Sequence, residues 1–434
     1  MHAVRSFLLV ILACSLAACT TPGPSYSSFD EYRTQTRQLI EQRRAFLAKE
    51  GKGMQAELEW NSPQEWRPAG LAAVSGGAAP ARGVLLVHGL GDSPWSFHDL
   101  GQRLAERGFL VRTVLLPGHG TRPDDLIAPG IADWRGLVRE QVALLKRDLG
   151  GRGHGGQVWL GGFSTGANLV TEYALDDDAI AGLLLFSPAF RSDTDIDWLA
   201  PWVAWARPWL RERDPNRPDQ SPVRYLITPT NGFSLFWRSS YAVRSRLADK
   251  PFEKPALLVT TANDSVVDVG FTLQAFQQSF THPASRLVWY GALPQEVGAD
   301  RAPPPRVLVR TDRLPERRIS QFSHMGLLFA PDNPLYGEAG SLRLCWNGQA
   351  PETVPRCEAG ETVWYSDWGY REDGKIHARL TYNPYFDWQF QVLEGVLGGA
   401  ADMQRADGRS DATARRAVDA PATGASGDGG ARAY

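Results

Sequence analysis

The sequence predicts an α/β fold with a mostly parallel, doubly wound sheet, and three observations support this prediction. Short apolar runs of strand length recur along the chain, and continuous apolar runs are typical of parallel strands buried on both faces. Segments with helical spacing of apolar residues separate these runs, as expected when helices cover both faces of such a sheet. The alternation stops between residues 190 and 250, which indicates a helical insertion.

The expected elements follow one another in the order that the alternation requires. The expected strands are residues 84–88, 109–115, 157–160, 180–186, 256–261 and 286–290. The expected helices are residues 100–107, 134–148, 167–174, 271–280 and, closing the domain, 383–393. With 434 residues, 43% of them hydrophobic, the chain can bury one large core with insertions or two small ones.

Two aromatic stripes at helical spacing occupy the interval from residue 190 to residue 250. They are Trp198, Trp202, Trp205 and Trp209, followed by Phe233, Phe236, Trp237 and Tyr241. Pro201 and Pro208 must start or kink the segments in which they lie. We expect most of these aromatic side chains to pack the insertion onto the core, while a minority could line a pocket for an apolar acyl group.

A serine at residue 164 lies where strand 157–160 passes directly into a helix, within the pentapeptide GFSTG (162–166). A serine on so tight a turn must adopt a strained backbone, and the flanking glycines let strand and helix pack closely around it. The hydroxyl then projects above the N-terminus of the helix, where it can act as a nucleophile. Ser164 is therefore the candidate catalytic nucleophile.

A second motif, HGLG (88–91), ends the first expected strand, and a third, LPGHG (116–120), follows the strand at 109–115. The bend at HGLG can aim the Leu90 N–H at a developing negative charge, and with the Thr165 N–H it would form the oxyanion hole of acyl transfer. Together these motifs resemble those of α/β-hydrolases, specifically lipase-like serine hydrolases related to monoacylglycerol lipases, carboxylesterases and S33 serine aminopeptidases. The resemblance covers roughly residues 84 to 324 and implies a helical cap insertion at about 190–250.

In this fold the acid and then the base follow the nucleophile along the chain. Asp264 lies in the loop after the buried run at 256–261, at the sheet end where doubly wound folds bind ligands. It fits the family pattern for the acid that fixes the tautomer of the catalytic histidine. Asp268, on the following turn, is the second choice, and Asp264 could instead cap the helix that begins near Val269.

Of the eight histidines, His324 is the candidate base. It follows the last expected core strand, in the segment QFSHMG (321–326), where the family places its catalytic histidine. The others lie in the leader, the two loop motifs, a helix start, a Gly-rich turn, a helix end and the polar C-terminal region. The resemblance thus implies a catalytic triad of Ser164, Asp264 and His324.

Residues 1–18 combine one Arg, an apolar stretch and small residues, which together are typical of a signal peptide. The segment LAAC (16–19) resembles a bacterial lipobox, in which Cys19 becomes the acylated N-terminus; an ordinary leader cleaved near Ala18 is the alternative. Several acyl chains on one Cys would hold the protein on a membrane firmly. With Thr20 beside the Cys, the sorting rule favours the periplasmic side of the outer membrane over the inner.

Cys345 and Cys357 remain once Cys14 leaves with the leader and Cys19 is acylated. An even pair in an oxidising compartment predicts a disulfide. A metal site is the other interpretation, but no nearby His or Cys completes a ligand set. No metal or cofactor is therefore expected.

The remaining segments surround the hydrolase domain, expected at 51–399. Within residues 19–50, a spacer rich in Pro, Gly and Ser precedes a polar helix at 29–49, which either docks on the domain or holds it off the bilayer. Residues 327–381 form an insertion that carries the predicted disulfide and could cover the site, bind a partner or brace the surface. Residues 400–434 lack periodicity and are predicted to be disordered.

The leading hypothesis is a membrane-tethered serine hydrolase that acts on carboxylic esters, plausibly acylglycerols or related lipids. A serine peptidase of the same fold and a non-catalytic envelope lipoprotein are the alternatives. The balance of 46 basic and 48 acidic residues gives no basic patch, so nucleic acid is not an expected partner.

Overall fold

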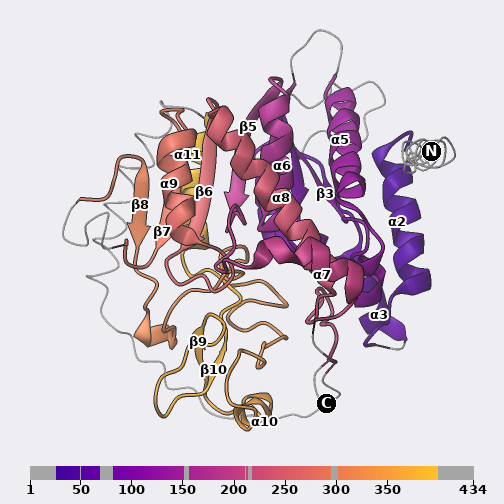
Figure 1. Cartoon of the computed structure of the whole chain (residues 1–434). Helices are drawn as coiled ribbons and strands as arrows, with labels where there is room; N and C mark the ends of the chain where they lie inside the picture. The colour runs from indigo at the N-terminus through magenta and orange to yellow at the C-terminus, as the bar shows by residue number, and fades with distance from the viewer. Residues whose placement is uncertain are drawn as a thin grey trace, which may run out of the picture.

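The computed structural model describes residues 26–48, 50–68, 82–150, 156–210, 212–213, 218–294 and 302–398. Its centre is an eight-stranded sheet in the order β1-β3-β2-β4-β5-β6-β7-β8, with helices on both faces (Figure 1). All neighbouring strands are parallel except β1 (Glu65–Trp66), which pairs antiparallel with β3 (Leu110–Val114). The predicted α/β fold is confirmed.

The predicted signal peptide, Cys19 and the spacer up to residue 25 lie outside the described residues. So does the C-terminal segment from residue 399 onward, which includes the tail predicted to be disordered.

All six expected strands are present. They are β2 (Arg82–Val87), β3 (Leu110–Val114), β4 (Gln157–Phe163), β5 (Ile180–Phe186), β6 (Ala256–Thr261) and β7 (Arg286–Tyr290). The sequence did not predict β1 or β8 (Val307–Arg310), which form the two edges of the sheet. β1 has only two residues and β8 is mostly half-buried, so neither has the long apolar run by which the central strands are recognised.

Successive strand side chains enter different cores on the two sides of the sheet. Leu183 and Leu185 of β5 pack with α5 (Ile131–Asp148), α6 (Thr165–Asp176) and α9 (Val269–Ser279). The intervening Leu184 and Phe186 pack on the opposite face with α4 (His98–Glu106) and α11 (Phe386–Gly398). This alternation follows from the two-residue period of a strand, and it buries the sheet on both faces.

The helix expected over residues 29–49 is shorter, α2 (Phe29–Arg43), and a second helix that was not expected, α3 (Gly51–Asn61), follows it. The α2 helix docks on the domain, because the Tyr32 hydroxyl accepts a hydrogen bond from the Leu115 N–H at 2.8 Å. Buried residues at 29, 32, 36 and 40 follow one helical face. Leu39 and Leu47, although apolar, are exposed.

The insertion between residues 190 and 250 is helical and contains η3 (Asp197–Leu199), α7 (Ala200–Ala206) and α8 (Thr230–Asp249). The expectation that its aromatic residues mostly pack onto the core is wrong for the first stripe. Trp198, Trp202 and Trp205 are 52%, 74% and 92% exposed. Trp198 lies in η3, and Trp202 and Trp205 lie in the seven-residue α7. Neither helix has a buried residue, so these tryptophans reach the surface.

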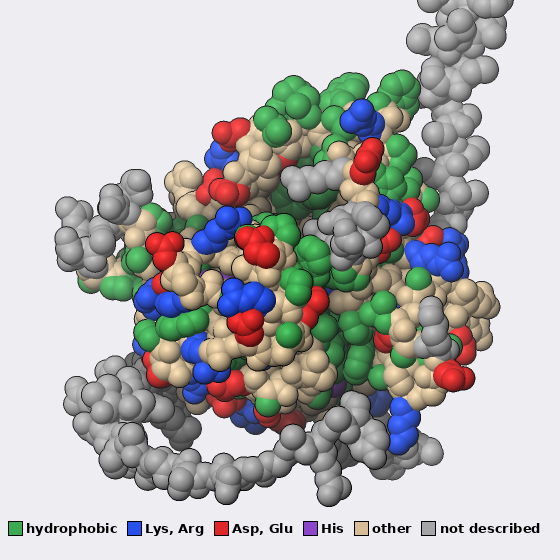
Figure 2. Space-filling view, turned by 90° about the horizontal axis from the view of Figure 1, so that it is seen from below, with side chains coloured by type: hydrophobic (Ala, Val, Ile, Leu, Met, Phe, Trp, Pro, Cys, Tyr) green, Lys and Arg blue, Asp and Glu red, His purple; other side chains and the backbone are tan. Residues whose placement is uncertain are grey.

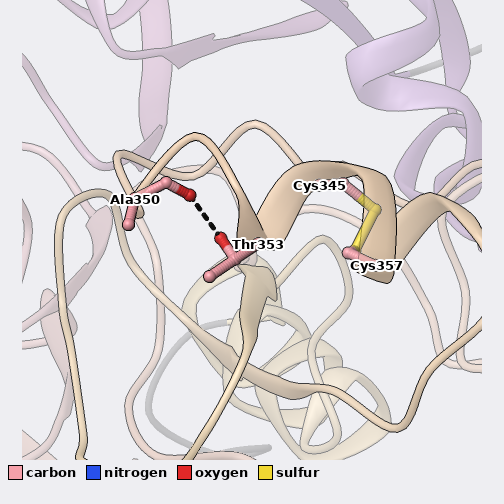
Figure 3. The surroundings of a disulfide bond; sticks show 4 residues. All are labelled: Cys345, Ala350, Thr353 and Cys357. Atoms are coloured by element: carbon pink, nitrogen blue, oxygen red, sulfur yellow. Dashed lines mark hydrogen bonds between the residues drawn. A yellow bond between two sulfur atoms is a disulfide. The ribbon is translucent and has the colours of Figure 1, made fainter.

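The second insertion, residues 327–381, lies below the sheet in the view of Figure 1. It contains α10 (Thr353–Glu358) and a parallel pair of three-residue strands, β9 (Trp364–Ser366) and β10 (His377–Arg379). The predicted disulfide joins Cys345 to Cys357. Nearby, the Thr353 hydroxyl donates a hydrogen bond to the Ala350 carbonyl at 2.7 Å (Figure 3).

The surface seen from below carries hydrophobic side chains beside interspersed basic and acidic ones (Figure 2). This mixture agrees with the net charge of −2. Within the ranges that the structure describes, every helix is too short or too polar to cross a membrane.

Candidate active site

Ser164 occupies the turn between β4 and α6 with a positive φ of 53°, a conformation that is strained for a residue with a side chain. The surrounding chain forces this geometry. A side chain at Gly162 would collide with the backbone of Ala167, and one at Gly166 would collide with the carbonyl of Val87. Only glycine fits at both positions, so the GFSTG pattern is a requirement of close packing between β2, β4 and α6.

The parallel sheet gathers the candidate residues at one edge. Leu90 follows β2, Ser164 follows β4 and Asp264 follows β6, and the C-terminal ends of parallel strands meet at the same edge. His324 reaches this edge from the segment that precedes the second insertion. Ser164 and His324 line one cavity with Leu90 and Thr165.

Asp264 and His324 form a buried pair. The His324 Nδ1 lies 2.6 Å from Asp264 Oδ2, and the carboxylate is fully buried. The other carboxylate oxygen accepts hydrogen bonds from the N–H groups of Val266 and Val267 at 2.9 and 3.2 Å. A carboxylate so fixed favours the tautomer with the proton on Nδ1, which leaves Nε2 to accept a proton.

Asp268, the second choice for the acid, has a different place. Its side chain accepts a hydrogen bond from the Phe271 N–H at 2.8 Å and thereby caps α9. It also lies 3.5 Å from Arg191. The helix cap that could have explained Asp264 is therefore provided by Asp268, and Asp264 is the residue that contacts His324.

The two amides proposed for the oxyanion hole are both available. Within the part of the chain that the structure describes, neither the Leu90 N–H nor the Thr165 N–H donates a hydrogen bond to another protein group. The loop that carries Leu90 is held by the next residue, because the Gly91 N–H donates to His119 Nε2 at 3.0 Å. Burial lowers the pKa of His119 to about 4, so its ring is neutral at pH 7 and can accept this bond.

His88 has a matching role on the same loop. Its Nε2 accepts a hydrogen bond from the Leu116 N–H at 3.1 Å, and burial holds the pKa of His88 well below its usual value. The two loop motifs HGLG and LPGHG are thus connected by neutral histidines. This arrangement explains why a histidine stands in each motif without requiring either to be a base.

Sequence reasoning missed Ser187, which fixes the backbone of the candidate base. It follows β5 with a positive φ of 41°, and its hydroxyl donates a hydrogen bond to the His324 carbonyl at 2.8 Å. The signal was a serine directly after a buried strand at the edge where the other candidates lie. Sequence reasoning also missed Asp92, which lines the cavity. Burial raises the pKa of Asp92, against the lowering effect of Arg224 and His324.

The cavity at Ser164 has a volume of 490 Å³. On the side of the first insertion its wall is mostly apolar: Ile196, Leu199, Val203, Leu210, Phe233 and Phe236. Phe233 and Phe236 of the second aromatic stripe therefore line the pocket, as was expected for a minority of the aromatic side chains.

No metal centre is found in this region. Across the ranges that the structure describes, no group of three or more His, Cys, Asp or Glu side chains could hold a metal ion. Cys345 and Cys357 are joined to one another.

Comparison with known proteins agrees with the fold and the motifs. Residues 78–293 match the family described as serine aminopeptidase, S33. A thermostable monoacylglycerol lipase from Bacillus sp. (strain H-257) is 28% identical over 193 residues, which are 43% of this chain and 72% of that protein.

The solved structures to which this chain is similar include two monoacylglycerol lipases. A soluble variant of the Saccharomyces cerevisiae enzyme is 15% identical, with 53% of this chain and 82% of that chain covered at a TM-score of 0.41. The Paleococcus ferrophilus enzyme is 19% identical, with 52% and 87% covered at a TM-score of 0.39. The fold is that of an α/β-hydrolase, and residues 78–293 are similar to the serine aminopeptidase S33 family.

Proposed function

We propose that this protein hydrolyses carboxylic esters through an acyl-enzyme on Ser164. The observation that carries the proposal is the 2.6 Å contact between His324 and the buried Asp264, in the cavity that Ser164 also lines. A buried carboxylate that orients a histidine beside a serine at a strained turn is the arrangement of acyl-transfer enzymes.

The proposed reaction has two halves, acylation and then deacylation of Ser164, and the same groups act in both. His324 accepts the Ser164 proton as the oxygen attacks the ester carbonyl, and the Leu90 and Thr165 amides bind the oxyanion. His324 then donates that proton to the leaving alcohol as the ester C–O bond breaks. Water repeats the sequence on the acyl-enzyme and releases the acid.

A fluorophosphonate probe tests the nucleophile directly. Wild type should be labelled, and Ser164→Ala should not be. Ser192→Ala is a matched control, because Ser192 lines the same cavity but stands away from the turn, and it should be labelled like wild type. Absence of labelling in wild type would favour the alternative of a non-catalytic lipoprotein.

We propose a lipid ester of the acylglycerol class as the substrate. Two observations support this class: the apolar wall of the 490 Å³ cavity, and the 28% identity to a monoacylglycerol lipase. A peptidase is the second candidate, since the matching family is described as a serine aminopeptidase. A series of p-nitrophenyl esters should be cleaved faster than aminoacyl anilides, and faster cleavage of the anilides would overturn the esterase assignment.

We further propose that the protein is anchored to the bacterial envelope through Cys19, on the periplasmic side and in the outer membrane rather than the inner. The exposed Trp202 and Trp205 on the first insertion suit contact with a lipid surface, where tryptophan is favoured. Metabolic labelling with a palmitate analogue should mark wild type but not Cys19→Ala. Separation of the two membranes by density would then locate the labelled protein.

A further inference from the structure

A second cavity of 600 Å³ adjoins the one at Ser164. The two cavities share five lining residues: Leu90, Arg224, Thr228, Phe233 and Val266. Leu90 is the residue whose amide is proposed to bind the oxyanion, so the boundary between the cavities lies beside the reacting carbonyl. A substrate held at Ser164 can therefore extend in two directions.

The second insertion builds much of the far wall of this cavity. Its contributions include Leu342, Arg343, Leu344, Trp346, Trp368 and Arg379. The cysteines of the disulfide lie next to this wall, because Cys345 itself lines the cavity. The disulfide therefore braces a segment that faces the substrate.

The two cavities differ in charge. The one at Ser164 is lined by Asp92 and Asp197 against a single arginine, Arg224. The second is lined by three arginines, Arg224, Arg343 and Arg379, against one carboxylate, Glu358. Acyl chains prefer the apolar first cavity, which leaves the more basic second cavity for the alcohol side of the ester.

Two of these arginines, Arg224 and Arg343, lack a close carboxylate partner among the described residues. Arg224 lies 3.6 Å from Asp92, beyond the range of a good hydrogen bond. The buried Nε of Arg224 has no hydrogen-bond partner among the described residues. In the same part of the chain, the exposed Arg343 has no carboxylate partner.

The Arg379 side chain is held in a fixed position on the wall of the second cavity. Its Nε donates to the side-chain oxygen of Asn347 at 2.7 Å, and its guanidinium lies 5.2 Å from the Trp368 ring centroid. The same wall is attached to the catalytic loop, because Asp367 accepts a hydrogen bond from the Ser265 N–H at 2.6 Å. Ser265 is next to Asp264, so the second cavity is positioned relative to the triad.

We propose that the second cavity binds the leaving alcohol of the substrate and selects an alcohol that carries a phosphate group. The proposal rests on the ester hydrolysis proposed above. Phosphate carries a charge of about −1.5 to −2 at pH 7, and arginine binds it through paired N–H donors. The ester C–O bond breaks as before, His324 protonates the alcohol oxygen, and the phosphorylated alcohol leaves while water becomes part of the acid. The phosphate ester itself stays intact.

Two substrates with the same acyl chain test this assignment, 1-decanoylglycerol and 1-decanoylglycerol 3-phosphate, each assayed below its aggregation concentration. We expect wild type to hydrolyse the phosphorylated ester with a kcat/KM about tenfold higher, as one charged hydrogen bond would give. Arg343→Gln should reduce this preference about tenfold, mainly through KM, and added salt should reduce it in wild type.

Arg356→Gln is the matched control. Arg356 lies in the same insertion but is exposed and paired with Glu361 at 2.7 Å, so the preference should be unchanged. Equal kcat/KM values of wild type for the two esters would overturn the phosphate assignment, as would an equal loss in Arg343→Gln and Arg356→Gln. Fluorophosphonate labelling and turnover of 1-decanoylglycerol report separately on the triad, so a failure of the cavity assignment is distinguishable from a failure of the proposed hydrolysis.

Discussion

The sheet of the hydrolase body and the second insertion are ordered by different means. The central strands β4, β5 and β6 run six or seven residues and bury apolar side chains on both faces. The insertion has strands of only three residues, a small apolar cluster around a disulfide, and fully buried polar groups such as Asn347 and Asp367. Apolar burial stabilises the first region. In the second, the two ends of the insertion, which include Leu327, Phe329 and Leu380, pack into the core of the body, while a covalent bond and polar contacts hold the part between them.

The two regions serve different purposes: one positions the proposed catalytic groups, and the other forms a wall for the substrate. A triad needs positions fixed to a fraction of an ångström, which a packed sheet edge supplies. A substrate wall can be built from a less regular segment if that segment is attached firmly to the rigid part. Here the attachment includes the bond from the Ser265 N–H to Asp367 and the bond from the Ser323 hydroxyl to the Leu380 carbonyl at 2.5 Å.

The largest expected effect lies in the proposed triad of Ser164, Asp264 and His324. Asp264→Asn should lower kcat about 10⁴-fold, because the amide favours the wrong tautomer of His324, while the fold is retained. Asp268→Asn is the matched control and should change kcat little, because that residue caps α9. The measurement is steady-state hydrolysis of a p-nitrophenyl ester. Near wild-type kcat for Asp264→Asn with an inactive Asp268→Asn would reverse the choice of acid.

A deletion in the sheet should destabilise the whole molecule. Leu258 of β6 is fully buried, so Leu258→Ala should lower the free energy of unfolding by about 2–5 kcal/mol through lost burial and a cavity. Chemical denaturation followed by tryptophan fluorescence and by activity should show one shift in both signals. If activity were lost well before the fluorescence change, the body would not be the single rigid unit that the comparison assumes.

Removal of the disulfide should affect the insertion more than the body. The double variant Cys345→Ser with Cys357→Ser should lose about 2–3 kcal/mol, because the unfolded loop is no longer restricted. Limited proteolysis should then cut within residues 327–381 first, while fluorophosphonate labelling of Ser164 persists. Protection of the insertion equal to wild type would show that its polar contacts suffice without the bond.

The last prediction concerns a contact between the two regions. Asp99 of α4 accepts hydrogen bonds from the Ala330 N–H at 2.7 Å and from the Asn333 side chain at 2.9 Å. Burial raises the pKa of Asp99 from 3.8 to about 6, against the lowering effect of those bonds. The folded state therefore holds this proton more tightly than the unfolded state, so the resulting stability is complete below pH 3.8 and is lost as the pH rises through 6.

Asp99→Asn removes this titration and provides the reference. The free energy of unfolding of wild type, measured relative to the variant by urea denaturation, should decrease between about pH 4 and pH 6 and stay constant above about pH 7. An increase over the same interval would show that the ionised carboxylate is the form that the contact favours.

The central strands and the turn at Ser164 could be predicted from the sequence because each is a local pattern. A buried parallel strand needs a continuous apolar run, and the turn needs Gly162 and Gly166 where no side chain fits. The edge strand β8 is mostly half-buried, so its sequence carries no comparable pattern. The exposure of Trp202 and Trp205 could not be predicted either, because helical spacing aligns side chains without deciding whether a neighbour covers them.

By itself, the sequence determined the alternation of strands and helices, the motifs at Ser164 and Leu90, and the order in which acid and base follow the nucleophile. The tertiary structure decided which carboxylate meets His324, since Asp264 and Asp268 are only four residues apart and differ only in the direction that the loop gives them. It also decided that Ser187 supports His324 and that the insertion after His324 forms a second cavity beside Leu90. Contacts between distant segments depend on the path of the backbone through space, which local residue patterns do not specify.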